Sequence, residues 1–542
     1  MQELSSIDSS SKSSRYLLIL VIWSLVAFFP FLGHIHLLDW DEVNFALSSR
    51  EMIESDNYLQ VTVNGEPFWE KPPMFFWLQT VSFRLFDNIE FAARFVSALA
   101  GFLTTLLIFF MGRQIISPRF GLIWSFLYSG SALSLFISKM GIMDPTLNLF
   151  VLSGIFSYTR MISSTDRSYL YAVLASASLA MAFLIKGPIA IVIPSIVFVI
   201  YFLFYEKSQF KLKHNIFFIL LLFIFSTSWY IIESFRNGFW FIEQFATYQL
   251  RLISTADAGH NGFFLFHFVV FMILCFPAST FFIKGFTDNW KSDGFSKIMA
   301  LLFGVVMVIF FIVKTKIVHY SSLVYVPGCY FAALTIRQFL KRERMSLTRL
   351  EWSLLSCSLI VFLILTLAVP ILVNRPELII PFIHNLNVVE SISQNIHWPL
   401  SGFFPGIFLF LSGVVVCYLF YRKSIISGLK FLIIVTMIFT NSLWAFYLPL
   451  LEKYLQGDLI QYYQEVKDQP IDLTTYKYKT YAHMFYAGKK VFRSVEDYNQ
   501  SEDRQPGLHI ITRKKDQSKI EERYPVNLLH NFGQFLVYEY IP

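Results

Sequence analysis

Charged residues are scarce in this chain. Asp, Glu, Lys and Arg make up only 15% of its 542 residues, whereas a typical soluble domain has roughly 25%. A water-soluble globule of this size could not bury the accompanying 55% of hydrophobic residues. The composition therefore predicts a polytopic membrane protein with modest soluble parts. The net charge of +7 is small for this length, and we expect no nucleic-acid partner.

Cysteine is also scarce. The four cysteines, Cys275, Cys329, Cys357 and Cys417, lie in apolar runs and lack the spacing of metal ligands. This pattern excludes a disulfide framework and a cysteine-based zinc site. An internal repeat and paired broken helices are missing as well, which disfavours a transporter built from inverted repeats.

Apolar runs of membrane-spanning length fill most of the chain. Hydropathy predicts an all-α polytopic fold with about thirteen transmembrane helices, at residues 16–33, 91–112, 119–138, 145–162, 168–185, 187–205, 214–232, 263–283, 297–314, 319–337, 352–373, 401–421 and 427–447. Lys and Arg gather in the loops on the side of the N-terminus. The positive-inside rule assigns that side to the cytoplasm, and an odd number of spans then places the C-terminus outside.

Three segments on the predicted outer side are long or polar. Two of them, residues 33–90 and 233–262, are outer loops of a transmembrane domain that we expect to cover residues 1–448. The third, residues 449–542, is a polar tail. Its runs at 508–512 and 535–541 are typical of strands, and the stretch 452–467 is typical of a helix. These patterns predict a small C-terminal α/β domain.

Acidic residues cluster where the first predicted span ends. Asp39, Asp41 and Glu42 stand within four residues of one another, and such carboxylates repel unless a cation or a proton shares the site. A solvated charged loop is the simpler alternative. Farther along, Asp144 precedes Pro145, which is typical of a helix start with the Asp side chain as its cap. Ionisable residues at span ends are costly in a membrane and are often functional.

Basic residues lie on the same predicted side. Lys71 follows Glu70 and precedes two prolines, which favour a rigid turn. Lys186 ends a predicted span, where a lysine often only reaches toward the interface. Further polar residues of the outer side are Arg251, His260, Lys316 and His319. Because Lys and Arg are the usual partners of phosphate oxygens, this face suits chemistry on a lipid-anchored phosphate.

Several of these residues belong to ordered motifs: Asp41-Glu42, Phe68-Trp69-Glu70-Lys71-Pro72-Pro73, Met143-Asp144, Ile185-Lys186-Gly187-Pro188, Gly259-His260 and Lys314 to Tyr320. The set resembles the bacterial aminoarabinose transferases that modify lipid A, and the wider protein O-mannosyltransferase-like group of GT-C glycosyltransferases. The resemblance covers about residues 16–335. After residue 340 only the layout matches, with more spans and then an outer soluble domain.

The resemblance implies a GT-C-like fold and a glycosyltransferase activity. The enzyme would move a single sugar, such as 4-amino-4-deoxy-L-arabinose or a related sugar, from a polyprenyl (undecaprenyl) phosphate to lipid A or another glycolipid outside the cytoplasm. It would lie in the bacterial inner membrane, with the active site and C-terminal domain facing the periplasm, and we expect a monomer surrounded by membrane lipids. A protein O-glycosyltransferase is the alternative of the same class, and a lipid-linked glycan transporter or flippase is the alternative of another class.

The resemblance also implies a role for each matching residue. The catalytic residues would be Asp41 and Asp144; the donor phosphate would contact Lys71, Arg251, Lys186 and Lys316; the substrate would contact Glu42, Trp69, His319 and Tyr320. Glu70 and His260 would hold a divalent metal ion (zinc, magnesium or manganese). Relatives often have Glu-His before the matching Arg, whereas this chain has Thr247-Tyr248, so the sequence leaves metal binding open.

Overall fold

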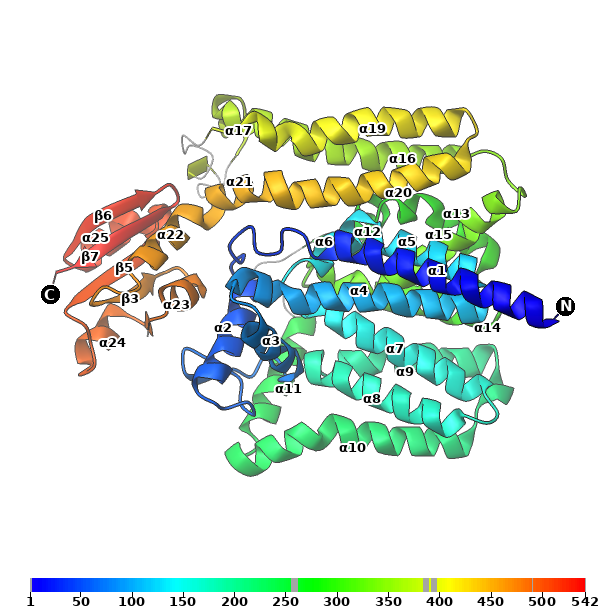
Figure 1. Ribbon diagram of the computed structural model, residues 1–542. Coiled ribbons are helices and arrows are strands. Elements are labelled where there is room, and N and C mark those ends of the chain that lie inside the picture. The colour runs from blue at the N-terminus through cyan, green and yellow to red at the C-terminus, as the bar shows by residue number, and fades with distance from the viewer. Residues whose placement is uncertain (1, 255–261, 384–388, 391–396, 490, 542) are drawn as a thin grey trace.

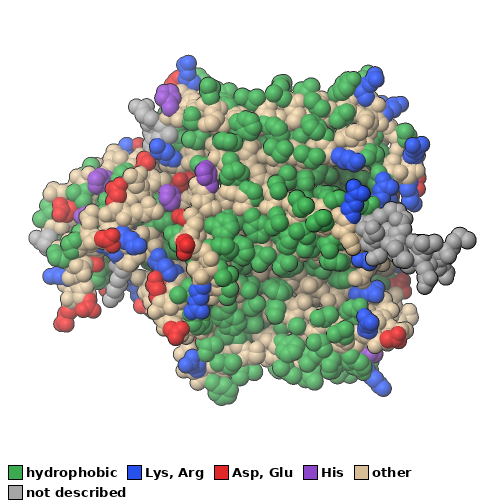
Figure 2. Space-filling view, in the orientation of Figure 1, with side chains coloured by type: hydrophobic (Ala, Val, Ile, Leu, Met, Phe, Trp, Pro, Cys, Tyr) green, Lys and Arg blue, Asp and Glu red, His purple; other side chains and the backbone are tan. Residues whose placement is uncertain are grey.

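Long helices run side by side through most of the molecule, and a small domain with a β-sheet lies at one end of them (Figure 1). The computed structural model describes residues 2–254, 262–383, 389–390, 397–489 and 491–541. The N-terminus lies at the opposite end of the bundle from the sheet domain. Figure 2 shows hydrophobic side chains across the lateral face of the bundle and charged side chains at its two ends, as expected for a protein that crosses a membrane.

The bundle is formed by helices of unequal length. They are α1 (Gln2–Phe28), α4 (Ile89–Ile115), α5 (Pro118–Ser129), α6 (Ala132–Ser138), α7 (Asp144–Ser163), α8 (Ser168–Lys186), α9 (Ile189–Phe204), α10 (Leu212–Asn237), α12 (Phe266–Leu274), α13 (Ala278–Asn289), α14 (Gly294–Ile312), α15 (Tyr325–Leu340), α16 (Arg349–Leu363), α17 (Val369–Asn374), α19 (Phe404–Tyr421) and α20 (Ile425–Ser442). A 3₁₀ helix, Val318–Val324, precedes α15.

Every one of the thirteen predicted spans overlaps a helix of this bundle, which confirms the all-α polytopic architecture. Among the described residues, eight helical segments are long and apolar enough to cross a membrane. The number rises to ten if two bent pairs each count as one span: α5 with α6, bent by 69°, and α12 with α13, bent by 114°. The segments Ser13–Phe28 and Ile189–Phe204 are apolar but shorter. The exact number of spans therefore stays a prediction.

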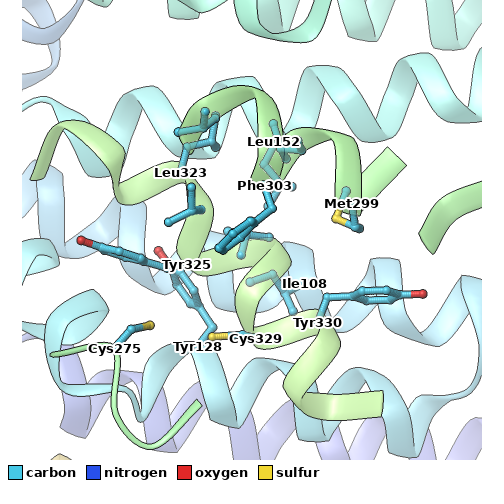
Figure 3. Packing of buried hydrophobic residues seen from close by; sticks show 14 of the residues in the cluster. Ile108, Tyr128, Leu152, Cys275, Met299, Phe303, Leu323, Tyr325, Cys329 and Tyr330 are labelled. Carbon is cyan, nitrogen blue, oxygen red and sulfur yellow. The ribbon is translucent and has the colours of Figure 1, made fainter. Parts of the chain in front are cut away.

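Local sequence explains several helix starts. The Asn88 side chain accepts a hydrogen bond from the backbone N–H of Phe91 at the start of α4. Thr348 and Glu351 form a capping box at the start of α16, where each side chain satisfies a backbone N–H that has no partner inside the helix. The bundle core is apolar and aromatic, and Figure 3 shows Cys275 and Cys329 packed among these side chains.

The predicted outer loops contain structure of their own. Residues 33–90 include α2 (Asp41–Glu54), a short hairpin of β1 (Thr62–Val63) and β2 (Glu66–Pro67), and α3 (Met74–Leu85). The second outer segment forms α11 (Trp240–Ser254). All of these elements lie at the end of the bundle that carries the sheet domain (Figure 1).

The C-terminal domain is a mixed α/β domain, as predicted. Its sheet has the order β4-β3-β5-β7-β6, in which β3 is parallel to β4 and β5, and β7 is antiparallel to β5 and β6. The elements are β3 (Ile471–Tyr476), α23 (Ala482–Ala487), β4 (Val491–Phe492), α24 (Val495–Gln500), β5 (Gly507–Arg513), α25 (Gln517–Arg523), β6 (Val526–Phe532) and β7 (Phe535–Tyr540). The runs predicted as strands at 508–512 and 535–541 correspond to β5 and β7.

One helical run connects the bundle to this domain. Beyond α20 it continues through α21 (Leu448–Glu452) and α22 (Asp458–Glu465), with a π-helical turn before each of them. The predicted domain boundary after residue 448 falls inside this run, and the division into two domains stays a prediction. The run carries the sheet domain over α2, where apolar side chains of both form one shared core.

Candidate functional site

A polar cavity of about 710 Å³ opens between the bundle and the C-terminal domain. It lies at the start of α2, at the start of α7, at the end of α8, beside α11 and before α15. Its lining side chains are Leu38, Asp39, Trp40, Asp41, Glu42, Asn44, Phe45, Glu70, Lys71, Met140, Ile142, Met143, Asp144, Lys186, Tyr248, Arg251, Ile317, His319, Tyr320 and Lys479. Motifs far apart in the sequence thus meet in one chamber.

The three carboxylates that follow the first span point to different partners. The Asp39 side chain accepts a hydrogen bond from the backbone N–H of Tyr481 in the C-terminal domain, and burial raises the pKa of Asp39. Glu42 is buried and faces Arg94. Asp41 is the most open of the three and lines the cavity. Separate partners relieve the repulsion that the sequence implies, and the α2 N-terminus favours acidic side chains in its first turn.

Glu42 forms a buried ion pair. Arg94 donates hydrogen bonds to both of its carboxylate oxygens at 2.9 Å, and the backbone N–H groups of Leu38 and Gly141 donate to the same oxygens. Arg94 also donates to three backbone carbonyls between Leu32 and His36. Although Glu42 touches the cavity wall, its hydrogen-bonding capacity is used by the protein. The geometry favours a positioning role for Glu42 over the expected substrate contact.

Asp144 and Lys186 form the ion pair at the centre of the site. The Lys186 ammonium donates to the Asp144 carboxylate at 2.6 Å and lies 4.5 Å above the centre of the Tyr320 ring. The prediction that Asp144 caps a helix is wrong: Asp144 is the first residue of α7, and no side-chain cap is present. Its carboxylate turns to Lys186 because a half-buried lysine needs a counter-charge more than the helix needs a cap.

A histidine connects this pair to Asp41. The His319 Nε2 atom lies 3.6 Å from an Asp144 oxygen and 3.8 Å from an Asp41 oxygen. The chain of contacts therefore runs from Lys186 through Asp144 and His319 to Asp41. Both carboxylates that the sequence marks as catalytic lie in one polar network.

The turn between α8 and α9 places Lys186 in the cavity. Lysine at a helix C-terminus is favoured by the helix dipole, and Gly187 then takes a positive φ of 73° that reverses the chain. A Cβ atom on Gly187 would lie 2.4 Å from the Phe245 ring. Only a glycine lets this turn pack directly against α11.

Helix α11 contributes an aromatic side chain and a cation. Phe241, Phe245 and Tyr248 are buried at helical spacing, and Arg251 follows three residues later. The Lys71 ammonium lies 3.4 Å from the Tyr248 hydroxyl and 4.8 Å from the centre of its ring, and Arg251 lies 5.2 Å from the same centre. Tyr248 thus holds both cations at one aromatic ring.

Lys71 is mostly buried at this place. Burial lowers its pKa, against the attraction of Glu70, which lies 4.0 Å away, and of Asp41. A desolvated ammonium interacts strongly with a phosphate that replaces its lost water.

A second, apolar cavity of about 270 Å³ adjoins the polar one. It is lined mainly by side chains of α7, α9 and α14, including Leu147, Val151, Ile193 and Val306. The two cavities share four residues: Lys71, Asp144, Lys186 and Tyr320. An apolar groove therefore ends at a pair of lysines.

Two of the described residues predicted for the site, Trp69 and Lys316, do not line this chamber. Trp69 is 40% exposed and does not line either cavity. The Lys316 ammonium donates to the backbone carbonyls of Phe310 and Phe311 at the end of α14, away from both cavities. His260 lies outside the described residues. The sequence reasoning in turn missed Tyr248 and Lys479 as parts of the site. The sequence marks Tyr248 only as a departure from the Glu-His of relatives, and nothing in the local sequence of Lys479 marks it.

The described residues offer no clear set of ligands for a divalent metal ion. Within the described parts of the chain, no three His, Cys, Asp or Glu side chains are grouped as metal ligands. Glu70 lies beside Lys71, and Tyr248 stacks on Lys71 near the place where relatives often have Glu-His. The described residues do not fit a metal centre, so the predicted metal stays a prediction.

The sequence model of the family described as dolichyl-phosphate-mannose-protein mannosyltransferase matches residues 70–231, a range that includes Glu70, Lys71, Asp144 and Lys186. An undecaprenyl phosphate-α-4-amino-4-deoxy-L-arabinose arabinosyl transferase of Proteus mirabilis is 24% identical over 254 residues, 46% of either chain. The similarly named protein of Pectobacterium carotovorum is 24% identical over 320 residues, 57% of this chain and 56% of its own. The matches span about half the length of these curated relatives.

The structural similarity covers more of the chain than the sequence similarity does. The crystal structure of ArnT from Cupriavidus metallidurans bound to undecaprenyl phosphate superposes with a TM-score of 0.76, at 16% identity, over 97% of this chain and 98% of that chain. At this level of identity the likeness concerns the fold, which includes both the bundle and the sheet domain.

Proposed function

We propose that this protein, a multi-pass membrane glycosyltransferase with the motifs and fold of the aminoarabinose transferases, moves a single sugar from a polyprenyl phosphate to a glycolipid outside the cytoplasm. A related structure was solved with undecaprenyl phosphate bound, and two curated relatives are named for a sugar carried on that lipid. We propose 4-amino-4-deoxy-L-arabinose or a related sugar as the donor group and a lipid A-type glycolipid as the acceptor.

The observation that carries this proposal is the junction of the two cavities. A polyprenyl tail needs an apolar groove, and its phosphate needs cations at the end of that groove. The apolar cavity beside α7 and α9 ends at Lys71 and Lys186, which also line the polar cavity. A lipid in the groove would bring its phosphate to these ammonium groups and its sugar into the polar chamber.

The reaction breaks one bond and forms another. The bond between the anomeric carbon and the donor phosphate oxygen breaks, and its electron pair leaves with the polyprenyl phosphate. Lys71 and Arg251, held at the Tyr248 ring, would stabilise the negative charge that grows on this phosphate. An acceptor oxygen forms the new bond to the anomeric carbon.

Asp41 is the proposed base of this step. It lies in the polar chamber, and its carboxylate is 3.8 Å from the His319 Nε2 atom. With a hydroxyl acceptor, Asp41 takes the hydroxyl proton as the new bond forms. With a phosphate acceptor, the attacking oxygen already carries charge, and Asp41 orients the acceptor. Asp144 holds Lys186 in place through their 2.6 Å ion pair until the donor phosphate arrives.

The proposed orientation follows from the charges. Basic residues concentrate at the end of the bundle that holds the N-terminus, and the polar chamber lies at the other end. The positive-inside rule supports a periplasmic chamber in the bacterial inner membrane.

A reconstituted transfer assay tests this proposal. The purified full-length chain in lipid nanodiscs receives a radiolabelled undecaprenyl-phosphate sugar and a glycolipid acceptor. We expect Asp41→Asn to lower the transfer rate by a factor on the order of 10² to 10⁴, the usual contribution of a general base to a hydroxyl acceptor, with undecaprenyl phosphate still bound. Lys71→Ala should lose donor binding. The control is Lys213→Ala, an exposed lysine at the other end of the bundle.

Two results would contradict the site. Wild-type turnover in both Asp41→Asn and Lys71→Ala would refute the roles of Asp41 as the base and of Lys71 as a phosphate contact. Counterflow of labelled lipid without a glycosylated product would favour the flippase alternative.

A further inference from the structure

One wall of the polar cavity is completed by the C-terminal domain. Lys479 lies between β3 and α23 and lines the cavity together with Trp40 and Asp41. Its ammonium lies 4.7 Å from the centre of the Trp40 ring and 5.7 Å from that of Tyr481. None of these residues belongs to the apolar cavity. Lys479 therefore stands on the wall away from the lipid groove.

This wall is held together by a set of hydrogen bonds. The Asp39 carboxylate accepts from the backbone N–H of Tyr481 at 3.1 Å. The Gln456 side chain accepts from the backbone N–H of Asp39 and donates to the carbonyl of Leu37. These contacts fix the segment before α2 to the domain that carries Lys479, and Figure 1 shows α23 beside α2. The same contacts that dock the C-terminal domain therefore also fix the position of Lys479 at the cavity.

Lys479 has different neighbours from the other two lysines that line the cavity. Lys186 is paired with Asp144, and Lys71 lies near Glu70. Across the described ranges, Lys479 makes no ion pair with a carboxylate, and its side chain is exposed. Aromatic rings attract the cation through their faces and do not neutralise its charge, so it can still donate to an anionic acceptor.

In the proposed reaction, one wall of the cavity binds the donor and the opposite wall faces the acceptor. The donor phosphate takes the lysines at the end of the lipid groove, so an acceptor has to approach from the opposite wall, where Asp41 and Lys479 stand. We propose that Lys479 binds an anionic group, a phosphate or a carboxylate, on the acceptor glycolipid and so selects acidic acceptors. This inference rests on the proposed function and adds a specificity residue from the C-terminal domain.

Acceptor kinetics of the full-length protein in nanodiscs test this inference. The acceptors are a phosphorylated glycolipid, a matched glycolipid with a carboxylate as its only anion, and the neutral form. We expect Lys479→Gln to raise the KM for an acidic acceptor about tenfold, the effect of one lost charge-assisted hydrogen bond, with kcat changed far less. The KM for the neutral acceptor should stay the same. The phosphate and carboxylate arms show which anion Lys479 selects.

Two variants serve as controls. Lys479→Arg keeps the positive charge and should restore most of the affinity for the acidic acceptor. Lys477→Gln removes a charge two residues away, where the lysine lies over Tyr476 and does not line the cavity, and should behave as the wild type.

The outcomes separate this inference from the proposed function. Unchanged acceptor KM in Lys479→Gln, or an equal rise for acidic and neutral acceptors, would overturn the role of Lys479 while normal wild-type transfer keeps the proposed function. A wild-type protein that transfers sugar to none of the three acceptors would overturn the proposed function itself, and the inference with it.

Discussion

The buried ion pair between Glu42 and Arg94 decides whether Glu42 is a substrate residue or a structural one. Arg94 is fully buried and Glu42 is 2% exposed. The Glu42→Gln variant keeps the size of the side chain and removes its charge. The guanidinium then stays buried without a counter-charge, and its contacts to the backbone around Ile35 keep it from leaving.

The expected cost follows from these contacts. Removing one partner of a buried ion pair costs about 3–5 kcal/mol. Glu42 also accepts hydrogen bonds from the backbone N–H groups of Leu38 and Gly141, and the amide group of Gln can accept at only one of its two ends. A buried N–H left without an acceptor adds about 1–3 kcal/mol. The sum, roughly 4–8 kcal/mol, approaches the whole stability of many proteins, about 5–15 kcal/mol.

Thermal unfolding of the purified protein in detergent measures this cost. We expect the unfolding midpoint of Glu42→Gln to fall by roughly 4–7 °C. The matched control is Glu54→Gln on the same helix, because Glu54 is 63% exposed and pairs with Arg50 at the surface. An exposed pair contributes about 0–1 kcal/mol, so its midpoint should hardly move. A Glu42→Gln protein with normal stability and no transfer activity would refute this reasoning and restore Glu42 as a substrate residue.

Two further predictions concern the donor side of the site. Burial lowers the pKa of Lys71, and the protonated form binds phosphate. Binding of undecaprenyl phosphate should therefore weaken as the pH rises through this lowered pKa, and Lys71→Arg, which stays protonated, should move the loss to higher pH; identical pH profiles would contradict the assignment. Gly187→Ala places a Cβ 2.4 Å from Phe245 at a positive φ and should lower stability by about 1–3 kcal/mol and weaken donor binding. The control is Gly238→Ala, which has a similar positive φ of +79° but open space around the new Cβ, so it measures the backbone strain alone. Equal thermal unfolding midpoints in the two variants would show that the contact with Phe245 has no energetic cost.

The sequence predicted much of the fold because a bilayer imposes strict rules on composition. Each span needs a long apolar run, so hydropathy found a helix in every predicted segment. The same rule forces the few ionisable residues toward the ends of the spans. Asp41, Lys71, Asp144 and Lys186 could therefore be named from their positions and motifs before any contact was known.

Neighbouring residues with the same chemistry could not be told apart in this way. Asp41 and Glu42 are adjacent acids, yet adjacent positions on a helix point about 100° apart. The Asp41 side chain is 37% exposed and that of Glu42 only 2%. Lys316 has the charge of a phosphate ligand, but α14 ends at Ile312 and leaves carbonyls without partners, which take its ammonium instead. The direction of a side chain, and the backbone groups that compete for it, depend on the folded backbone.

By itself, the sequence determined the membrane class of this protein, the helical architecture, the α/β character of its tail and the chemical types gathered on one side. These follow from local composition, periodicity and charge. Only the tertiary structure decided that an apolar groove ends at Lys71 and Lys186, that Tyr248 holds the cations, and that Lys479 reaches the site from the far end of the chain. Tertiary packing brings together segments that are far apart in the chain, and no local pattern in either segment predicts the contact.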